Sequence, residues 1–190
     1  MIRFFPVRAL PGLFLFLALP GLPPLAEEVG LHDYALSDLE GTGTNLGSYK
    51  GKILVVEFFA TWCPSCRKDL PEVASLQENY PSEQVAFVAV SADSVSGTTR
   101  RLPAFLKEMG LKIPVLVGGE ILVDRYAGVE RRGAREISLP QTYIFSGEGA
   151  ILMRPAGVQK SKRKWLVEVR DRIVEEPFSG VTASVGPRPS

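Results

Sequence analysis

The feature that most constrains the fold is a pair of apolar segments separated by a helical pattern. Residues 52–59 (KILVVEFF) and 85–91 (VAFVAVS) are rich in β-branched and aromatic side chains, which is typical of strands buried on both faces of a sheet. Between them, one helix face is apolar, at Leu70, Val73, Ala74 and Leu76. Strand, helix and strand over about 40 residues predict a βαβ unit with parallel strands and a right-handed crossover.

The segments that follow extend this unit into a layered α/β domain. Residues 102–109 have the pattern of a helix, and residues 113–117 that of a short strand. Residues 141–145 and 150–153 flank the turn sequence SGEG at 146–149, which predicts a hairpin. An amphipathic helix is then predicted from the spacing of Trp165, Leu166, Val169 and Ile173.

The first 26 residues have the pattern of an export segment. Arg3 and Arg8 are the only charged residues before Glu27, and residues 9–25 are apolar throughout. This pattern predicts either a signal peptide cleaved after Ala26 or an uncleaved N-terminal membrane anchor. We therefore expect a globular part that lies outside the cytoplasm, in the periplasm or an equivalent compartment, where disulfides persist.

Composition limits the partners. The chain has 190 residues, with 22 basic and 21 acidic side chains, so its formal net charge is +1. Such a balance gives no electrostatic reason to expect nucleic acid as a partner. Residues 177–190, rich in Pro, Gly and Ser, predict a disordered tail. We expect a monomer whose single domain covers residues 31–176.

The two cysteines of the chain, Cys63 and Cys66, allow three interpretations. A structural zinc site takes four ligands, and the chain offers only one histidine, His32, besides the cysteines. His32 itself is most simply a surface residue. A purely structural disulfide between these cysteines would close a very short loop and constrain the unfolded chain little. Both interpretations are therefore weak.

A redox-active dithiol fits the local pattern better. Cys63 falls where a buried strand gives way to a helix, so the N–H groups of the first helical turn favour its thiolate. Pro64 suits the first helical position. Cys66 lies about one turn inside the helix, sheltered but able to attack a mixed disulfide on Cys63. This interpretation makes Cys63 the nucleophile and Cys66 the resolving cysteine, and it needs no metal or organic cofactor.

The residues around the dithiol resemble the thioredoxin superfamily. Residues 62–66 (WCPSC) follow an apolar strand as the active-site motif of that superfamily does. The wider pattern is similar to its exported TlpA/ResA branch, in residues 34–41 (YALSDLEG), Leu46, Tyr49, residues 50–52 (KGK), 67–72 (RKDLPE), 139–145 (LPQTYIF) and 146–149 (SGEG). The resemblance spans residues 31–175 and implies a thioredoxin-like fold, with a central mixed sheet flanked by helices on both faces.

The resemblance also implies roles for residues near the dithiol. Pro140 would be a cis proline that faces the cysteines and orients the substrate backbone, whereas the residues alone favour a trans proline that begins a strand. Trp62, Pro64 and Leu139 would contact the substrate, Trp62 also packing beside Cys63. Residues 128–138 (GVERRGAREIS) are longer than the family pattern, and they are either a partner-contact loop or tolerated surface variation.

Glu57 is an unexpected acid inside the apolar strand 52–59. Strand alternation places it on the face of Ile53, Val55 and Phe59, where burial disfavours a charged carboxyl. It lies six residues before Cys63, as the buried acid of thioredoxins does, whereas the TlpA/ResA branch often has asparagine there. We hypothesise that Glu57 moves the proton of Cys66. The alternative is an acid at a solvated strand end.

The expected function is an exported thiol–disulfide oxidoreductase that reduces protein disulfides. In resembling systems the electrons come from a membrane thiol transporter, and the clients include haem-attachment cysteines of cytochromes c and metal-site cysteines. Two alternatives remain. The first is a thiol peroxidase, since residues 91–94 (SADS) faintly resemble peroxiredoxins. The second is a non-enzymatic copper carrier that uses Cys63, Cys66 and His32.

Overall fold

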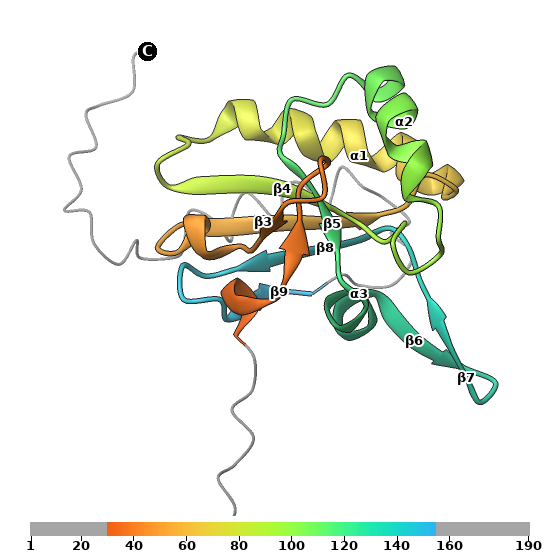
Figure 1. The fold of residues 1–190 in the computed structure, drawn as a ribbon. Helices are drawn as coiled ribbons and strands as arrows, with labels where there is room; N and C mark the ends of the chain where they lie inside the picture. Colours follow the sequence, from red (N-terminus) through yellow and green to blue (C-terminus); the bar gives the residue numbers. More distant parts are fainter. Residues whose placement is uncertain (1–29, 155–190) are drawn as a thin grey trace, which may run out of the picture.

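The computed structural model describes residues 30–154, which fold around a seven-stranded sheet (Figure 1). Its strands are β1 (Leu36–Ser37), β2 (Gly43–Thr44), β3 (Ile53–Phe59), β4 (Val85–Ser91), β5 (Val115–Gly118), β8 (Gln141–Phe145) and β9 (Ile151–Met153). They are ordered β2-β1-β5-β4-β3-β8-β9. The pairs β3–β4 and β4–β5 are parallel and the other pairs are antiparallel. The sheet is therefore mixed, as predicted.

Within residues 30–154, three α-helices cover the sheet. They are α1 (Pro64–Leu76), α2 (Leu102–Met109) and α3 (Glu120–Ala127), and short 3-10 turns occupy η1 (Leu31–Asp33), η2 (Gly47–Tyr49), η3 (Gln77–Asn79) and η4 (Thr99–Arg101). Figure 1 shows α1 and α2 on one face of the sheet and α3 on the other. The predicted thioredoxin-like α/β arrangement is confirmed.

Strand β3 is the centre of the core, and all seven of its residues are buried. It pairs in parallel with β4 from Ile53↔Val85 to Phe59↔Ser91. Alternate side chains face opposite layers. Phe59 stacks on Phe105 of α2, with ring centroids 5.6 Å apart, whereas Phe58 stacks on Tyr126 of α3 at 5.7 Å. The odd-numbered residues of β3, Glu57 among them, thus face α1 and α2.

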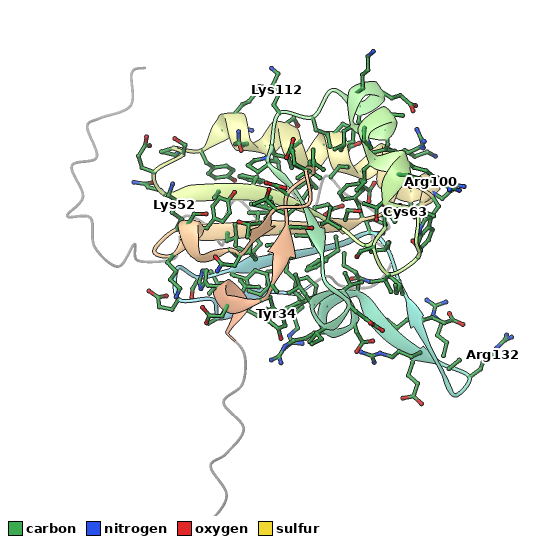
Figure 2. All side chains as sticks on the ribbon, in the orientation of Figure 1. Tyr34, Lys52, Cys63, Arg100, Lys112 and Arg132 are labelled. Atoms are coloured by element: carbon green, nitrogen blue, oxygen red, sulfur yellow. A yellow bond between two sulfur atoms is a disulfide. The ribbon has the colours of Figure 1, made fainter. Side chains whose placement is uncertain are left out.

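One edge of the sheet gathers several chain connections. Because β3, β4 and β5 are parallel, the loops that follow them leave the sheet at the same edge. Strand β8 runs antiparallel to β3 and begins at this edge, with Gln141 opposite Phe58. Figure 2 shows Cys63 at the end of the molecule where β3 finishes, and Lys52 at the opposite end. The two cysteines and the segment before β8 therefore meet at one edge.

Residues 128–138 form a hairpin that we did not predict. Strands β6 (Gly128–Arg131) and β7 (Ala134–Ile137) pair antiparallel and project from the body of the protein (Figure 1). The two residues at the tip, Arg132 and Gly133, have φ values of 51° and 78°. Left-handed residues at both central positions match the twist of a two-residue hairpin turn. The extra length is therefore an ordered hairpin, not an irregular loop.

His32 is buried, so our expectation of a surface residue is wrong. It lies in η1 and is 3% exposed. The turn between β8 and β9 covers it, since a Cβ atom added at Gly149 would lie 3.2 Å from two atoms of the imidazole. This turn is at the end of β8 remote from Pro140. His32 therefore lies away from the two cysteines and cannot join them in the copper site considered above.

Three predicted segments lie outside the described residues: the export segment 1–26, the closing helix around 165–173 and the tail 177–190. Within residues 30–154, no helix has the length and apolar character needed to cross a membrane.

Candidate active site

Cys63 and Cys66 form a disulfide at the start of α1, and their Cα atoms are 5.3 Å apart. Cys63 is the N-cap residue of the helix, and Pro64 occupies the first turn, where no intrahelical N–H is needed. The backbone N–H of Cys66 donates to Sγ of Cys63 at 3.2 Å. The helix thus directs an N–H group and the positive end of its dipole at this sulfur. After reduction, both effects favour the thiolate of Cys63.

The two sulfurs differ in their access to solvent. Cys66 is fully buried, whereas Cys63 keeps 4% of its surface exposed. This order of exposure agrees with the expected outer nucleophile and inner resolving cysteine. Cys63 is nevertheless more enclosed than we expected. The hydroxyl of Ser65 lies 3.4 Å from Sγ of Cys63, and Pro64 and Ser65 are both exposed. An incoming disulfide can therefore reach only the outer sulfur.

Pro140 lies at the same edge of the sheet. The Leu139–Pro140 peptide bond is cis, as the family resemblance implied, so the alternative of a trans proline is wrong. Pro140 immediately precedes Gln141, which pairs with Phe58 near the end of β3. Leu139 and Pro140 are both half-buried. The register thus places this segment beside the strand that leads to Cys63, with part of its surface open to a partner.

Glu57 has no exposed surface, so the alternative of a solvated strand end is wrong. It pairs across the sheet with Thr142 of β8 on one side and Ala89 of β4 on the other. The hydroxyl of Thr142 donates a hydrogen bond to Oε2 of Glu57. Glu57 lies on the sheet face that α1 covers, and the inner side of α1 carries the buried Cys66. The carboxyl and the resolving thiol thus share one buried layer.

Trp62 is a large apolar side chain on the surface beside Cys63. It is 41% exposed, so it packs less than we predicted and presents more of its ring to a partner. Its indole N–H donates to the hydroxyl of Ser96 at 2.9 Å. Ser96 belongs to the loop that follows β4, so this hydrogen bond joins that loop to the loop between β3 and α1, which carries Trp62.

The sequence reasoning missed Asp93, which is buried at this edge. It follows β4 by two residues, and both of its carboxylate oxygens accept hydrogen bonds from Thr61, the residue before Trp62. An acid two residues after a buried parallel strand is a signal that the sequence contains.

Comparisons with known proteins agree with this geometry. The model of the AhpC/TSA family matches residues 30–154. The thioredoxin-like protein YneN of Bacillus subtilis (strain 168) is 30% identical over 131 residues, which cover 66% of this chain and 72% of that protein. The thiol-disulfide oxidoreductase ResA of Bacillus thuringiensis subsp. konkukian (strain 97-27) is 29% identical over 133 residues, covering 69% and 70% of the two chains.

The same fold is found among solved structures. A thiol:disulfide interchange protein of the thioredoxin family from Chlorobium tepidum TLS superposes with a TM-score of 0.58. It is 23% identical, and the match covers 76% of this chain and 96% of that one.

Proposed function

The chain belongs to the AhpC/TSA family of thioredoxin-like proteins, and we propose that it works in the reductive direction on disulfides of exported proteins. It is a thiol–disulfide oxidoreductase that acts through the pair Cys63–Cys66. The observation that carries the proposal is the position of Cys63 at the N-cap of α1, where the N–H of Cys66 donates to its sulfur. A sulfur held in this way is a good nucleophile as a thiolate and a good leaving group in the return step.

The first step joins the enzyme to its client. The Cys63 thiolate attacks one sulfur of a client disulfide, and the second client sulfur leaves as a thiolate that takes a proton from solvent. Trp62, Pro64 and Leu139 provide the apolar contacts to the client, and Pro140 orients its backbone. Trp62 is 41% exposed and the other three are exposed or half-buried, so all four have surface available for this contact.

The second step releases the client. Cys66 loses its proton and attacks the sulfur of Cys63, so the mixed disulfide breaks and the first client cysteine leaves as a thiolate that takes a proton from solvent. Cys63 and Cys66 become the disulfide present in the structure. Because Cys66 is fully buried, water is a poor acceptor for its proton. Glu57, buried in the same layer, accepts that proton and later passes it on.

A thiol protein then reduces the enzyme by the same two exchanges in reverse. We propose a membrane-bound donor of this kind, and clients whose paired cysteines must be reduced before they bind haem or a metal. We also propose that residues 1–26 direct the chain out of the cytoplasm, as a cleaved signal or as an anchor, and that the domain acts as a monomer. The basis is the pattern of two arginines followed by the apolar segment 9–25.

Trapping of the mixed disulfide tests the proposal. The variant Cys66→Ser should accumulate a mixed disulfide on Cys63 in the native compartment, visible on a non-reducing gel and identified by mass spectrometry. Cys63→Ser is the matched control and should trap nothing. The wild-type protein should also reduce the disulfides of insulin in the presence of dithiothreitol. Absence of both the trapped client and the insulin reduction would exclude the oxidoreductase function.

The thiol peroxidase alternative has a separate test. A peroxidase would consume hydrogen peroxide at a rate proportional to the enzyme concentration, and Cys63 would be the residue that the peroxide oxidises. We expect a peroxide consumption no faster than that of an equal concentration of an unactivated thiol. Rapid peroxide turnover, lost in Cys63→Ser, would favour the peroxidase.

A further inference from the structure

Asp93 is a fully buried carboxylate that the catalytic cycle above does not use. It accepts four hydrogen bonds from side chains and backbone. The N–H and the hydroxyl of Thr61 donate at 2.9 and 2.6 Å. The hydroxyl of Ser91 donates at 2.8 Å, and the hydroxyl of Thr98 donates as well. Charge-assisted bonds of this number keep a buried carboxylate stable in one orientation.

These hydrogen bonds join two loops that are far apart in the sequence. Thr61 belongs to the loop between β3 and α1, whereas Asp93 and Thr98 belong to the loop after β4. Backbone bonds support the junction, since Ala92 N–H donates to Phe59 at 2.8 Å and Thr98 N–H donates to Asp93 at 2.8 Å. The carboxylate is thus the common acceptor for both loops. Thr61 is followed directly by Trp62 and Cys63, so the junction lies at the base of the active-site loop.

A chain of hydrogen bonds extends from this carboxylate to the surface. The hydroxyl of Thr98 lies 2.8 Å from the hydroxyl of Ser96. Ser96 in turn accepts the indole N–H of Trp62 at 2.9 Å. An indole that is 41% exposed is only partly enclosed by the protein, and its N–H is its only hydrogen-bonding group. The connected hydroxyls therefore determine the orientation of the ring.

We propose that Asp93 is a positioning residue that holds Trp62 and the start of the Cys63 loop in the arrangement that receives the client. It acts through Thr61 on the backbone and through Thr98 and Ser96 on the indole. Asp93 does not touch the client or the sulfurs. This proposal rests on the proposed function for its kinetic consequence, but the fixed orientation of Trp62 can be measured without any activity.

The first readout is the fluorescence anisotropy of Trp62. The chain has two tryptophans, so a Trp165→Phe background leaves Trp62 as the only tryptophan, which excitation at long wavelength selects over the tyrosines. In this background we expect Asp93→Asn and Ser96→Ala to lower the anisotropy, because the indole gains rotational freedom. Ser94→Ala is the matched control: Ser94 lies in the same loop, but its hydroxyl donates to the carbonyl of Gly118, outside the chain of bonds to Trp62. This control should keep the anisotropy of the parent.

The second readout is the kinetics of reduction of a disulfide-bonded polypeptide such as insulin. Asp93→Asn and Ser96→Ala should each raise KM about two- to tenfold, the equivalent of one lost hydrogen bond, with a smaller change in kcat. Combining Ser96→Ala with Trp62→Phe should add nothing to the effect of Trp62→Phe alone, because both changes remove the same contact.

The outcomes separate this proposal from the proposed function. If Asp93→Asn does not fold, the exposed Ser96→Ala variant still tests the connection to Trp62. An anisotropy and a KM like those of the parent in Ser96→Ala and in any folded Asp93→Asn would overturn the positioning role. A parent protein without any disulfide reductase activity would instead contradict the proposed function, while a fall in anisotropy would still support the structural part of this inference.

Discussion

The hydroxyl of Thr142 donates a hydrogen bond to the buried carboxyl of Glu57, so strand β8 holds the acid that lies beneath the dithiol helix. The same strand begins directly after Pro140. One short segment therefore carries Pro140, which we propose orients the client, and Thr142, which bonds to the acid. This hydrogen bond helps to stabilise an acid in a strand whose other six residues are all apolar and buried.

Replacing Glu57 by Gln should slow the release of the client and leave the fold intact. Gln keeps an acceptor for the hydroxyl of Thr142 but cannot take a proton from Cys66. We expect resolution of the mixed disulfide to slow about tenfold or more near neutral pH, with a changed pH–rate profile. Single-turnover release of a labelled client measures this step. Glu72→Gln, the same exchange at an exposed position of α1, is the control. A pH–rate profile identical to that of the wild type would show that Glu57 does not accept the proton of Cys66.

The two cysteines of the reduced protein should differ in reactivity. Cys63 keeps exposed surface and receives the N–H of Cys66, whereas Cys66 is fully buried. At pH 7, iodoacetamide should alkylate Cys63 about ten times faster than Cys66 or more. Peptide mass spectrometry after timed quenching measures both rates. The difference should vanish in denaturant, and equal rates in the native protein would contradict the assignment of nucleophile and resolving cysteine.

His32 should make the stability of the protein depend on pH. Burial, and next the positive charge of Lys50, lower the pKa of His32 below its ordinary value of 6.5. Nε2 of His32 has no hydrogen-bond partner among the described residues. A lowered pKa means that the unfolded chain binds a proton more readily than the folded one. The stabilisation is present above pH 6.5 and is lost as the pH falls through the lower pKa of the folded protein.

We expect the melting temperature, Tm, to fall as the pH is lowered from 7.5 to 5. His32 is the only histidine of the chain, so His32→Gln should remove most of this decrease. A wild-type Tm that is constant over this range, or a slope that His32→Gln leaves unchanged, would show that the imidazole does not resist protonation.

The hairpin β6–β7 should loosen in acid. Arg135 of β7 donates to the carboxylate of Asp124 in α3 at 2.5 and 3.0 Å, and to its backbone carbonyl at 2.8 Å. The hydrogen bond from Arg135 lowers the pKa of Asp124 below its ordinary value of 3.8. The stabilisation that comes from the ionised Asp124 is present above pH 3.8. It is lost as the pH falls through the lower pKa that Asp124 has in the folded protein.

Hydrogen exchange of residues 128–137 measures the effect. Asp124→Asn at pH 7 should speed exchange in the hairpin while the Tm stays close to that of the wild type, because the ion pair is exposed. Glu120→Gln, an exposed acid in the first turn of α3, should leave the exchange rates as they are. If Asp124→Asn also leaves hairpin exchange unchanged, then the pairing of β6 with β7 alone holds this segment.

Local patterns in the sequence determined the central βαβ unit and the dithiol. These predictions rest on local patterns: the apolar segments of β3 and β4, and the helical spacing of apolar residues in α1. Such patterns can be recognised from residues that are neighbours in the sequence. The same reasoning placed Cys63 at a helix N-terminus and Glu57 on a buried face. Helix α3 was missed although Leu122, Val123 and Tyr126 have helical spacing. The apolar spacing that indicates a helix is thus present in α3, but the segment is only eight residues long.

Only the tertiary structure decided which distant residues meet. Thr61 bonds to Asp93, thirty-two positions away, and the burial of His32 depends on the turn at Gly149. Neither relationship leaves a periodic trace in the sequence, because each arises where loops from different strands converge at an edge of the sheet. Local sequence thus supplied the reactive groups of this protein, whereas strand order and register decided which groups surround them, since contacts of that kind form only when the whole sheet has assembled.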